Sequence, residues 1–276
     1  EWKDSIKLFF YANPLLEALR KAKETPPLPI KTHSERLDSG DRGLSLAMLR
    51  ALRVFYDEHG GLDKVMGDVC KEAGFAASVC ALTRSTGLSL AESVVHAAES
   101  SGASSAALVE HATTFFSYSW TGTRLGDMLD AVEGQLERLE AADGRLRFVW
   151  IDMFCASQNL LAGVFEPDAH PRGSAERAAR KEDTDHIFGD ALEAVGELLL
   201  YCSPLRGTWL APPHPYLDPA CGEPPERWER RGPGAITRAW CLFEMGECLA
   251  KGYPLHVVLS PADVEGFERL LTHRFD

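Results

Sequence analysis

The sequence predicts an α/β protein in which a parallel sheet carries helices on both faces and is preceded by a small helical unit. Short runs rich in β-branched, aromatic and aliphatic residues recur at 113–118, 147–152, 198–203 and 255–259, and segments with helical periodicity separate them. Alternation of this kind is typical of parallel sheets, because a helix usually makes the right-handed crossover between parallel strands. Between residues 44 and 111 the pattern is helical instead.

The composition is that of an ordinary globular protein. The 276 residues are 45% hydrophobic and 25% charged. A chain of this length buries a core without needing disulfides. Its longest apolar stretches are far shorter than the roughly 20 residues of a membrane helix, so we expect no transmembrane segment.

The charge balance excludes one class of partner. Asp and Glu total 41 against 29 Lys and Arg, a formal net charge of −12. Such a chain repels phosphate backbones, so we expect no nucleic acid partner. Basic side chains outnumber acidic ones within residues 1–32, which form either a docking tail or a solvated end without a role. Pro26, Pro27 and Pro29 make 24–42 an extended linker.

The seven cysteines are scattered, with no C-x-x-C pair and no zinc-ligand spacing. We therefore expect neither a metal site nor a resident cofactor. Unpaired thiols are typical of a reducing compartment, so the expected protein is intracellular, either soluble or peripherally attached. Because the chain does not begin with Met, we expect a piece of a longer or processed protein.

The first elements belong to the helical unit. Apolar residues from Leu44 through Tyr56 recur at helical spacing and predict an amphipathic helix that ends at Gly60 and Gly61. Ser89 and Glu92 have the spacing of a capping box. We divide the chain into a basic, Pro-rich tail and linker (1–42), a helical unit (43–111) and an α/β domain (112–276). The helical unit is expected to be almost wholly helical and to carry no site of its own.

The elements of the α/β domain follow in order. A helix from Leu125 joins the first two strands, and the polar segment 155–185 is expected to be a long loop or insertion. Helices at 185–196, 235–251 and 263–271 alternate with the remaining strands, and 204–234, rich in Pro and Gly, is a second long connection. Ligands of such sheets bind at the carboxyl ends of the strands. Candidate site residues are therefore sought after Tyr118, Ile151 and Cys202.

Three segments resemble those of TIR (Toll/interleukin receptor) domains. Phe115-Phe116-Ser117-Tyr118-Ser119-Trp120 resembles the first strand of that family, and Val149-Trp150-Ile151-Asp152 resembles the second. Trp240-Cys241-Leu242-Phe243-Glu244 is similar to the W-C-L-x-E helix of plant and bacterial members. With a helical segment in front, the chain also resembles TIR-related domains of protists and algae. The resemblance covers roughly 112–276, although the R-G-x-D that follows the first strand in plant members is absent.

The resemblance implies a flavodoxin-like fold and one of two functions. The first is an interaction or scaffold module that binds protein partners or self-associates, either by itself or as a subunit of a larger assembly. The second is an NAD glycohydrolase that cleaves the nicotinamide–ribose bond, with NAD as substrate. In cleaving members the key carboxylate lies at the position of Glu244, where it can stabilise positive charge on the ribose.

Each candidate site residue has an alternative structural role. Glu244 is either the catalytic carboxylate or a solvated helix residue. Ser117, Ser119, Trp120, Asp152 and Trp240 are the candidate ligand-binding residues. The serines can instead bond to the backbone, Asp152 can cap a turn, and Trp240 can anchor the core. We expect Glu244, Cys241 and Cys248 to form one inward-facing stripe of their helix.

Overall fold

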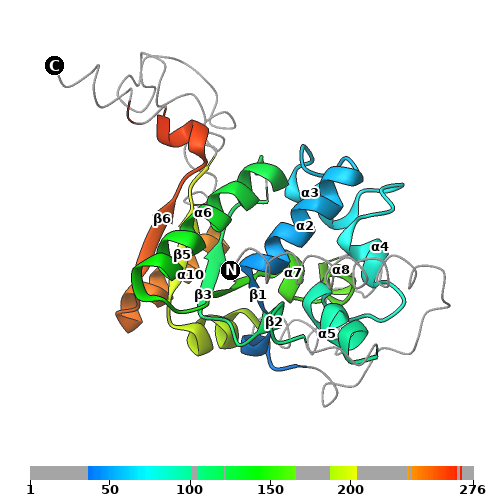
Figure 1. Cartoon of the computed structure of the whole chain (residues 1–276), viewed down its shortest axis with the longest axis horizontal. Helices are drawn as coiled ribbons and strands as arrows, with labels where there is room; N and C mark the ends of the chain where they lie inside the picture. Colours follow the sequence, from blue (N-terminus) through cyan, green and yellow to red (C-terminus); the bar gives the residue numbers. More distant parts are fainter. Residues whose placement is uncertain are drawn as a thin grey trace.

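The computed structural model describes residues 37–100, 105–120, 122–165, 187–203, 235, 238–265 and 268. Within these residues a six-stranded sheet with the order β2-β1-β4-β3-β5-β6 forms the centre of the molecule (Figure 1). Its strands are β1 (Gly43–Ser45), β2 (Val109–Glu110), β3 (Thr114–Ser117), β4 (Phe148–Ile151), β5 (Leu198–Tyr201) and β6 (Leu255–Val258).

The four predicted strands are neighbours in this sheet and run parallel. Phe115 of β3 pairs with Trp150 of β4 on one side and with Leu198 of β5 on the other, and Leu198 pairs with Leu255 of β6. Across the sheet the parallel strands lie in the order β4-β3-β5-β6. Numbered along the chain this is 2-1-3-4, the order with which a flavodoxin-like sheet begins. The predicted α/β fold class is confirmed.

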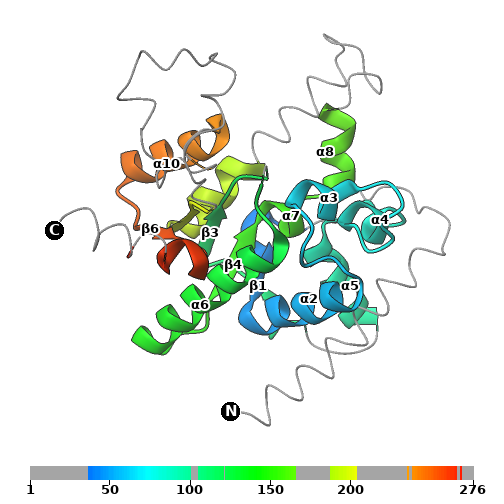
Figure 2. The same cartoon turned by 90° about the horizontal axis from the view of Figure 1, so that it is seen from above.

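Helices cover both faces of the sheet. Figure 2 shows α10 (Ala239–Lys251) on one face and α6 (Leu125–Asp143) with α2 (Leu46–Glu58) on the other. The central strands β3, β4 and β5 are buried at every position, which explains the nearly continuous apolar sequences of β4 and β5. At the edge of the sheet β6 is only partly covered.

The two long helices of the α/β domain end at glycines. Gly144 after α6 has φ 70° and Gly252 after α10 has φ 71°, a left-handed conformation that glycine adopts without steric cost. The predicted start of α10 at residue 235 is wrong, because Arg238 has extended backbone angles and the helix begins at Ala239. Residues 187–195, within the predicted helix 185–196, are helical. Among the described helices none combines the length and apolarity needed to cross a bilayer.

The helical unit consists of α2, α3 (Met66–Lys71), α4 (Val79–Thr83) and α5 (Leu90–Ser100). Its predicted capping box is present, because the backbone N–H of Ser89 donates to Glu92 (2.8 Å) and the backbone N–H of Glu92 donates to Ser89 Oγ (3.1 Å). Met48, Leu52 and Phe55 form the buried face of α2, which packs against α6.

The expectation that 44–111 would be almost wholly helical is wrong at both ends of this unit. Leu44 lies in β1, which runs antiparallel to β2 and to β4, so the unit extends the sheet of the α/β domain. Gly43 allows this pairing, because a Cβ there would lie only 2.6 Å from the Cα of Ala112. Both parts share one hydrophobic core, and the boundary at residue 112 stays a prediction.

The end of the predicted linker belongs to the folded body. Residues 1–36 of the 1–42 segment lie outside the described residues, but Ser39–Arg42 form a 3-10 helix, η2. The buried guanidinium of Arg42 donates to the carbonyl of Cys155 at 3.2 Å and pairs with Glu92 at 3.5 Å. These contacts tie the chain before β1 to the helical unit and to the region after β4.

The loop predicted at 155–185 is wrong in its first part. Helices α7 (Asp152–Cys155) and α8 (Gln158–Phe165) occupy the segment that follows β4. The apolar run Leu160–Phe165 forms most of α8. The residues that follow it in the sequence are strongly polar, and they made the whole segment resemble a loop. The rest of the predicted loop (166–185) and the predicted connection at 204–234 lie outside the described residues.

Candidate functional site

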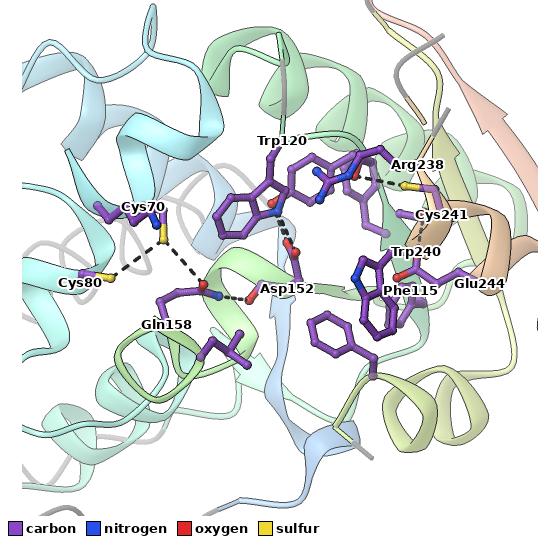
Figure 3. A pocket seen from close by; sticks show the side chains of 16 residues that line it. Cys70, Cys80, Phe115, Trp120, Asp152, Gln158, Arg238, Trp240, Cys241 and Glu244 are labelled. Carbon is purple, nitrogen blue, oxygen red and sulfur yellow. Dashed lines mark hydrogen bonds between the residues drawn. The ribbon is translucent and has the colours of Figure 1, made fainter. Parts of the chain in front are cut away.

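A cavity of about 280 Å³ opens at the carboxyl ends of β3 and β4 (Figure 3). Its walls come from β3, the start of α7, α8 and α10, and also from α3 and α4 of the helical unit. The chain turns to opposite sides of β3 to form β4 and β5. The carboxyl end of β3 is therefore the switch point at which ligands bind in sheets of this type.

Glu244 enters the cavity from α10. Along this helix Cys241, Glu244 and Cys248 are the buried positions, at spacings of three and four residues, so the predicted inward-facing stripe is confirmed. Only 7% of Glu244 is exposed, yet its side chain lines the cavity. The carboxylate is therefore neither in bulk solvent nor sealed in the core.

Among the described residues, one side chain hydrogen-bonds to the Glu244 carboxyl. The hydroxyl of Ser117, at the end of β3, donates to its Oε2 over 2.5 Å. Burial raises the pKa of Glu244 to about 8, and the charge of Asp152 adds to the rise, while the Ser117 hydrogen bond and the Arg238 guanidinium oppose it. At neutral pH this pKa favours the protonated form of the Glu244 carboxyl.

Asp152 is the anchor of the opposite wall. Its carboxylate accepts hydrogen bonds from Tyr118 Oη (2.5 Å), Trp120 Nε1 (2.8 Å) and the backbone N–H of Met153 (2.6 Å). Burial raises the pKa of Asp152, and the three donors act against that rise. Asp152 is the first residue of α7, whose N-cap is Ile151 without a side-chain cap bond, so the predicted capping role is not found. The contacts with Tyr118 and Trp120 fix aromatic side chains beside the cavity.

The two tryptophans of the candidate site differ from Trp150. Trp150 is fully buried and donates to the carbonyl of Ser39 at 2.9 Å, so it anchors the core. Trp240 is 42% exposed, lines the cavity and stacks on Phe188 with ring centres 5.8 Å apart. Trp120 lies across the cavity, where Asp152 holds its indole N–H (Figure 3). A planar aromatic ligand can contact either indole.

Five of the six candidate residues line this cavity: Ser117, Trp120, Asp152, Trp240 and Glu244. Ser119 does not line it. Its side chain is 1% exposed, and neighbouring residues already engage it. Alternation along a strand would place Ser117 and Ser119 on the same face, but β3 ends at Ser117, so Ser119 lies beyond the regular strand.

Sequence reasoning missed the wall that the helical unit supplies. Cys70, Lys71 and Cys80 line the cavity, so the helical unit contributes to the wall of the candidate site, and the expectation that it has no site of its own stays a prediction. Arg238, which precedes α10, and Gln158 of α8 were missed as well. Arg238 directly precedes the W-C-L-x-E helix, so its position beside that motif could have identified it. The other residues had none, because only the tertiary fold brings them to β3.

The cavity wall combines a carboxyl group whose pKa is raised, a hydroxyl group, indole faces and a guanidinium group. Within the described residues, Arg238 makes no ion pair closer than 4 Å, so its charge is available to an anionic ligand group. No group of three or more His, Cys, Asp or Glu side chains in that part of the chain is placed to hold a metal ion.

Comparisons of the chain with protein-family models, with curated proteins and with solved structures each find no match.

Proposed function

We propose that the protein hydrolyses the bond between nicotinamide and ribose in NAD, with Glu244 as the carboxylate at the ribose. One observation carries the proposal: a buried acid on α10 borders a cavity at the carboxyl end of the first parallel strand, where Ser117 orients it. The resemblance of the surrounding segments to TIR domains supports the choice of substrate.

The size and lining of the cavity fit the reacting half of the substrate. Its volume of about 280 Å³ lies near the lower end of the roughly 300–1,000 Å³ of small-molecule sites. That space suits a nicotinamide riboside group rather than a whole dinucleotide. Trp120 and Trp240 offer indole faces to the nicotinamide ring, and Arg238 offers a cation to a phosphate.

The raised pKa of Glu244 suits a cationic substrate. In the free protein the group ionises only near pH 8. The positive pyridinium ring of bound NAD favours the charged carboxylate and lowers that pKa. Substrate therefore generates the anion that the reaction needs.

The bond between C1′ of the ribose and N1 of nicotinamide then breaks, and nicotinamide leaves as a neutral molecule with the bonding electron pair. The Glu244 carboxylate stabilises the positive charge that develops on the ribose. Water adds to C1′ and releases a proton to solvent, which gives ADP-ribose. Incubating the purified protein with NAD and separating the products by liquid chromatography tests this proposal, with nicotinamide and ADP-ribose expected in equal amounts.

A second candidate function is self-association through the TIR-like domain, as an interaction or scaffold module. Apolar side chains are exposed on α10 and on the edge strand β6, namely Leu242 (47%), Phe243 (48%), Leu249 (65%) and Val257 (62%). Exposed apolar side chains that gather on one surface are typical of protein contact sites. Sedimentation velocity over a range of concentrations is the test, with assembly in the unchanged chain and its loss in Leu249→Asp.

An intracellular location belongs to the same proposal. The six described cysteines are all free thiols, a state typical of reducing compartments. NAD is also available there. Fractionation of the source cells under native conditions is the direct test.

A further inference from the structure

Two cysteines of the helical unit meet in the wall of the cavity. Cys70 on α3 and Cys80 on α4 have their sulfur atoms 4.0 Å apart (Figure 3). Both side chains are buried, with 3% and 9% exposure, but both line the cavity. Small solutes that enter the cavity therefore reach a pair of neighbouring thiols.

A chain of hydrogen bonds links this pair to the candidate site. The thiol of Cys70 donates to Gln158 Oε1 over 3.6 Å, and Gln158 Nε2 donates to the backbone carbonyl of Asp152 over 2.7 Å. The carboxylate of Asp152 in turn holds Tyr118 and Trp120. Figure 3 shows these residues in sequence from Cys80 to Trp120 along one side of the cavity.

We propose that Cys70 and Cys80 form a redox-active dithiol whose closure to a disulfide changes the candidate site through Gln158 and Asp152. The disulfide itself is independent of the proposed NAD hydrolysis. Its effect on turnover rests on that proposed function, so the two are tested by separate measurements.

The reaction with a peroxide balances in two steps. The sulfur of Cys80, the more exposed of the two, attacks one peroxide oxygen; the O–O bond breaks, and a sulfenic acid and one water result. The sulfur of Cys70 then attacks that sulfur and displaces hydroxide, which takes the Cys70 proton and leaves as a second water. The two thiols lose two electrons in total, and these reduce hydrogen peroxide to two molecules of water.

Closure requires only a local movement. A disulfide bond is about 2.05 Å long, so the two sulfur atoms must approach by roughly 2 Å. The short helices α3 and α4 carry them and pack against each other. The pKa of the Cys70 thiol is raised, first by its hydrogen bond with Cys80 and then by burial, so its attack on the sulfenic acid of Cys80 is expected to be slow.

The disulfide removes the proton that Cys70 donates. The buried Oε1 of Gln158 then loses this donor, and the amide is driven to reorient or to draw in water. Its Nε2 also holds the carbonyl of Asp152 at the start of α7. Reorientation therefore releases the backbone that positions the Asp152 carboxylate, and with it the indole of Trp120.

Peptide mapping of the full chain tests the disulfide directly. The reduced protein is treated with hydrogen peroxide, or with diamide as a second oxidant, and its remaining thiols are alkylated. Digestion without reduction is expected to yield a peptide pair joined through Cys70 and Cys80, which dithiothreitol separates. Recovery of both as alkylated thiols after both oxidants, or of a sulfinic acid without the linked pair, overturns the proposal.

Two further readouts test the link to the site. Oxidation is expected to change the nicotinamide release rate about threefold or more, since one buried hydrogen bond is lost. The change is expected to be absent in Cys80→Ser and present in Cys202→Ala, which alters a buried cysteine outside the cavity. If the disulfide forms and turnover stays the same, the proposed link is wrong.

A protein that releases no nicotinamide in either state would contradict the proposed function but not the dithiol. The link is then measured by tryptophan emission. Oxidation is expected to shift the emission of the unchanged chain, and Trp120→Phe is expected to remove that shift. An identical shift in Trp120→Phe overturns the link to Asp152 and Trp120.

Discussion

The hydroxyl of Ser117, the last residue of β3, donates a 2.5 Å hydrogen bond to Oε2 of Glu244, a residue 127 positions further along the chain. This contact joins the first parallel strand to α10, the helix that covers β5 and β6. It holds the carboxyl at the edge of the cavity rather than in the core. The chemistry proposed for Glu244 depends on this position.

Replacing Ser117 with Ala is expected to shift the pH dependence of nicotinamide release. The Ser117 hydrogen bond lowers the pKa of Glu244, which is about 8 with the bond present. Its loss raises that pKa, so the inflection in kcat/KM moves to higher pH, and activity at pH 7 falls about 3- to 10-fold. Ser119→Ala, at a buried serine outside the cavity, is the matched control. An unshifted inflection in Ser117→Ala would contradict this role.

The stability of the protein is expected to fall with pH because of Glu244. The unfolded chain ionises this group near 4.5, whereas the folded protein keeps the proton until about pH 8. Between these values the folded state binds more protons, so the free energy of unfolding decreases as the pH rises, and this decrease ends above about pH 8. Glu244→Gln removes the contribution.

Urea unfolding at pH 5 and pH 8.5 measures this effect. Between pH 5 and pH 8.5, the free energy of unfolding of Glu244→Gln is expected to rise, relative to that of the unchanged protein, by on the order of a few kcal/mol. Glu247→Gln, three residues along the same helix, serves as the control and is expected to gain none. A Glu244→Gln difference that is the same at both pH values would show that the carboxyl is not protonated by burial.

Asp152→Asn is expected to disturb substrate binding more than the chemical step. Tyr118 and Trp120 donate to different oxygens of the Asp152 carboxylate. In Asp152→Asn the amide oxygen can still accept from one of them, but the NH2 group cannot accept from the other. One aromatic side chain then loses its partner, at a cost of about 1–3 kcal/mol in stability. Steady-state kinetics are expected to show a KM increase of about 10-fold, with a smaller change in kcat. A kcat loss with unchanged KM would assign Asp152 to the chemistry instead.

Leu52→Ala is expected to destabilise the whole molecule in one transition. Leu52 is 1% exposed on α2, within the core that the helical unit shares with the sheet. Truncating a buried leucine costs about 2–5 kcal/mol. Calorimetry is expected to give a single transition at lower temperature for this variant. Two separate transitions would mean that residues 43–111 fold as an independent domain.

The sheet was predictable because its strands have a strong local signal. Thr114–Ser117, Phe148–Ile151 and Leu198–Tyr201 are rich in aromatic, aliphatic and β-branched residues, and the helices between them have clear periodicity. β1 and β2 were not predictable, since strands of three and two residues next to helical segments carry almost no periodicity. Pairing with β2 and β4 makes β1 a strand.

The candidate site likewise contains residues that the sequence indicates and residues that it does not. Ser117, Asp152 and Glu244 stand at motif positions at the ends of strands or on a helix, so the sequence indicated them. Cys70 and Gln158 have no such signal, because α3 and α8 reach the cavity only through the tertiary packing of the helical unit against the sheet.

The most direct test of the central claim is the initial rate of nicotinamide release from NAD by the unchanged protein, Glu244→Gln and Glu247→Gln, each with folding verified by circular dichroism. Glu244→Gln preserves the shape of the side chain and an acceptor for Ser117 but cannot carry negative charge. We expect release by the unchanged protein and by Glu247→Gln, with Glu244→Gln slower by about 100-fold or more. Absence of release by the unchanged protein, or equal rates for it and Glu244→Gln, would contradict the proposed role of Glu244.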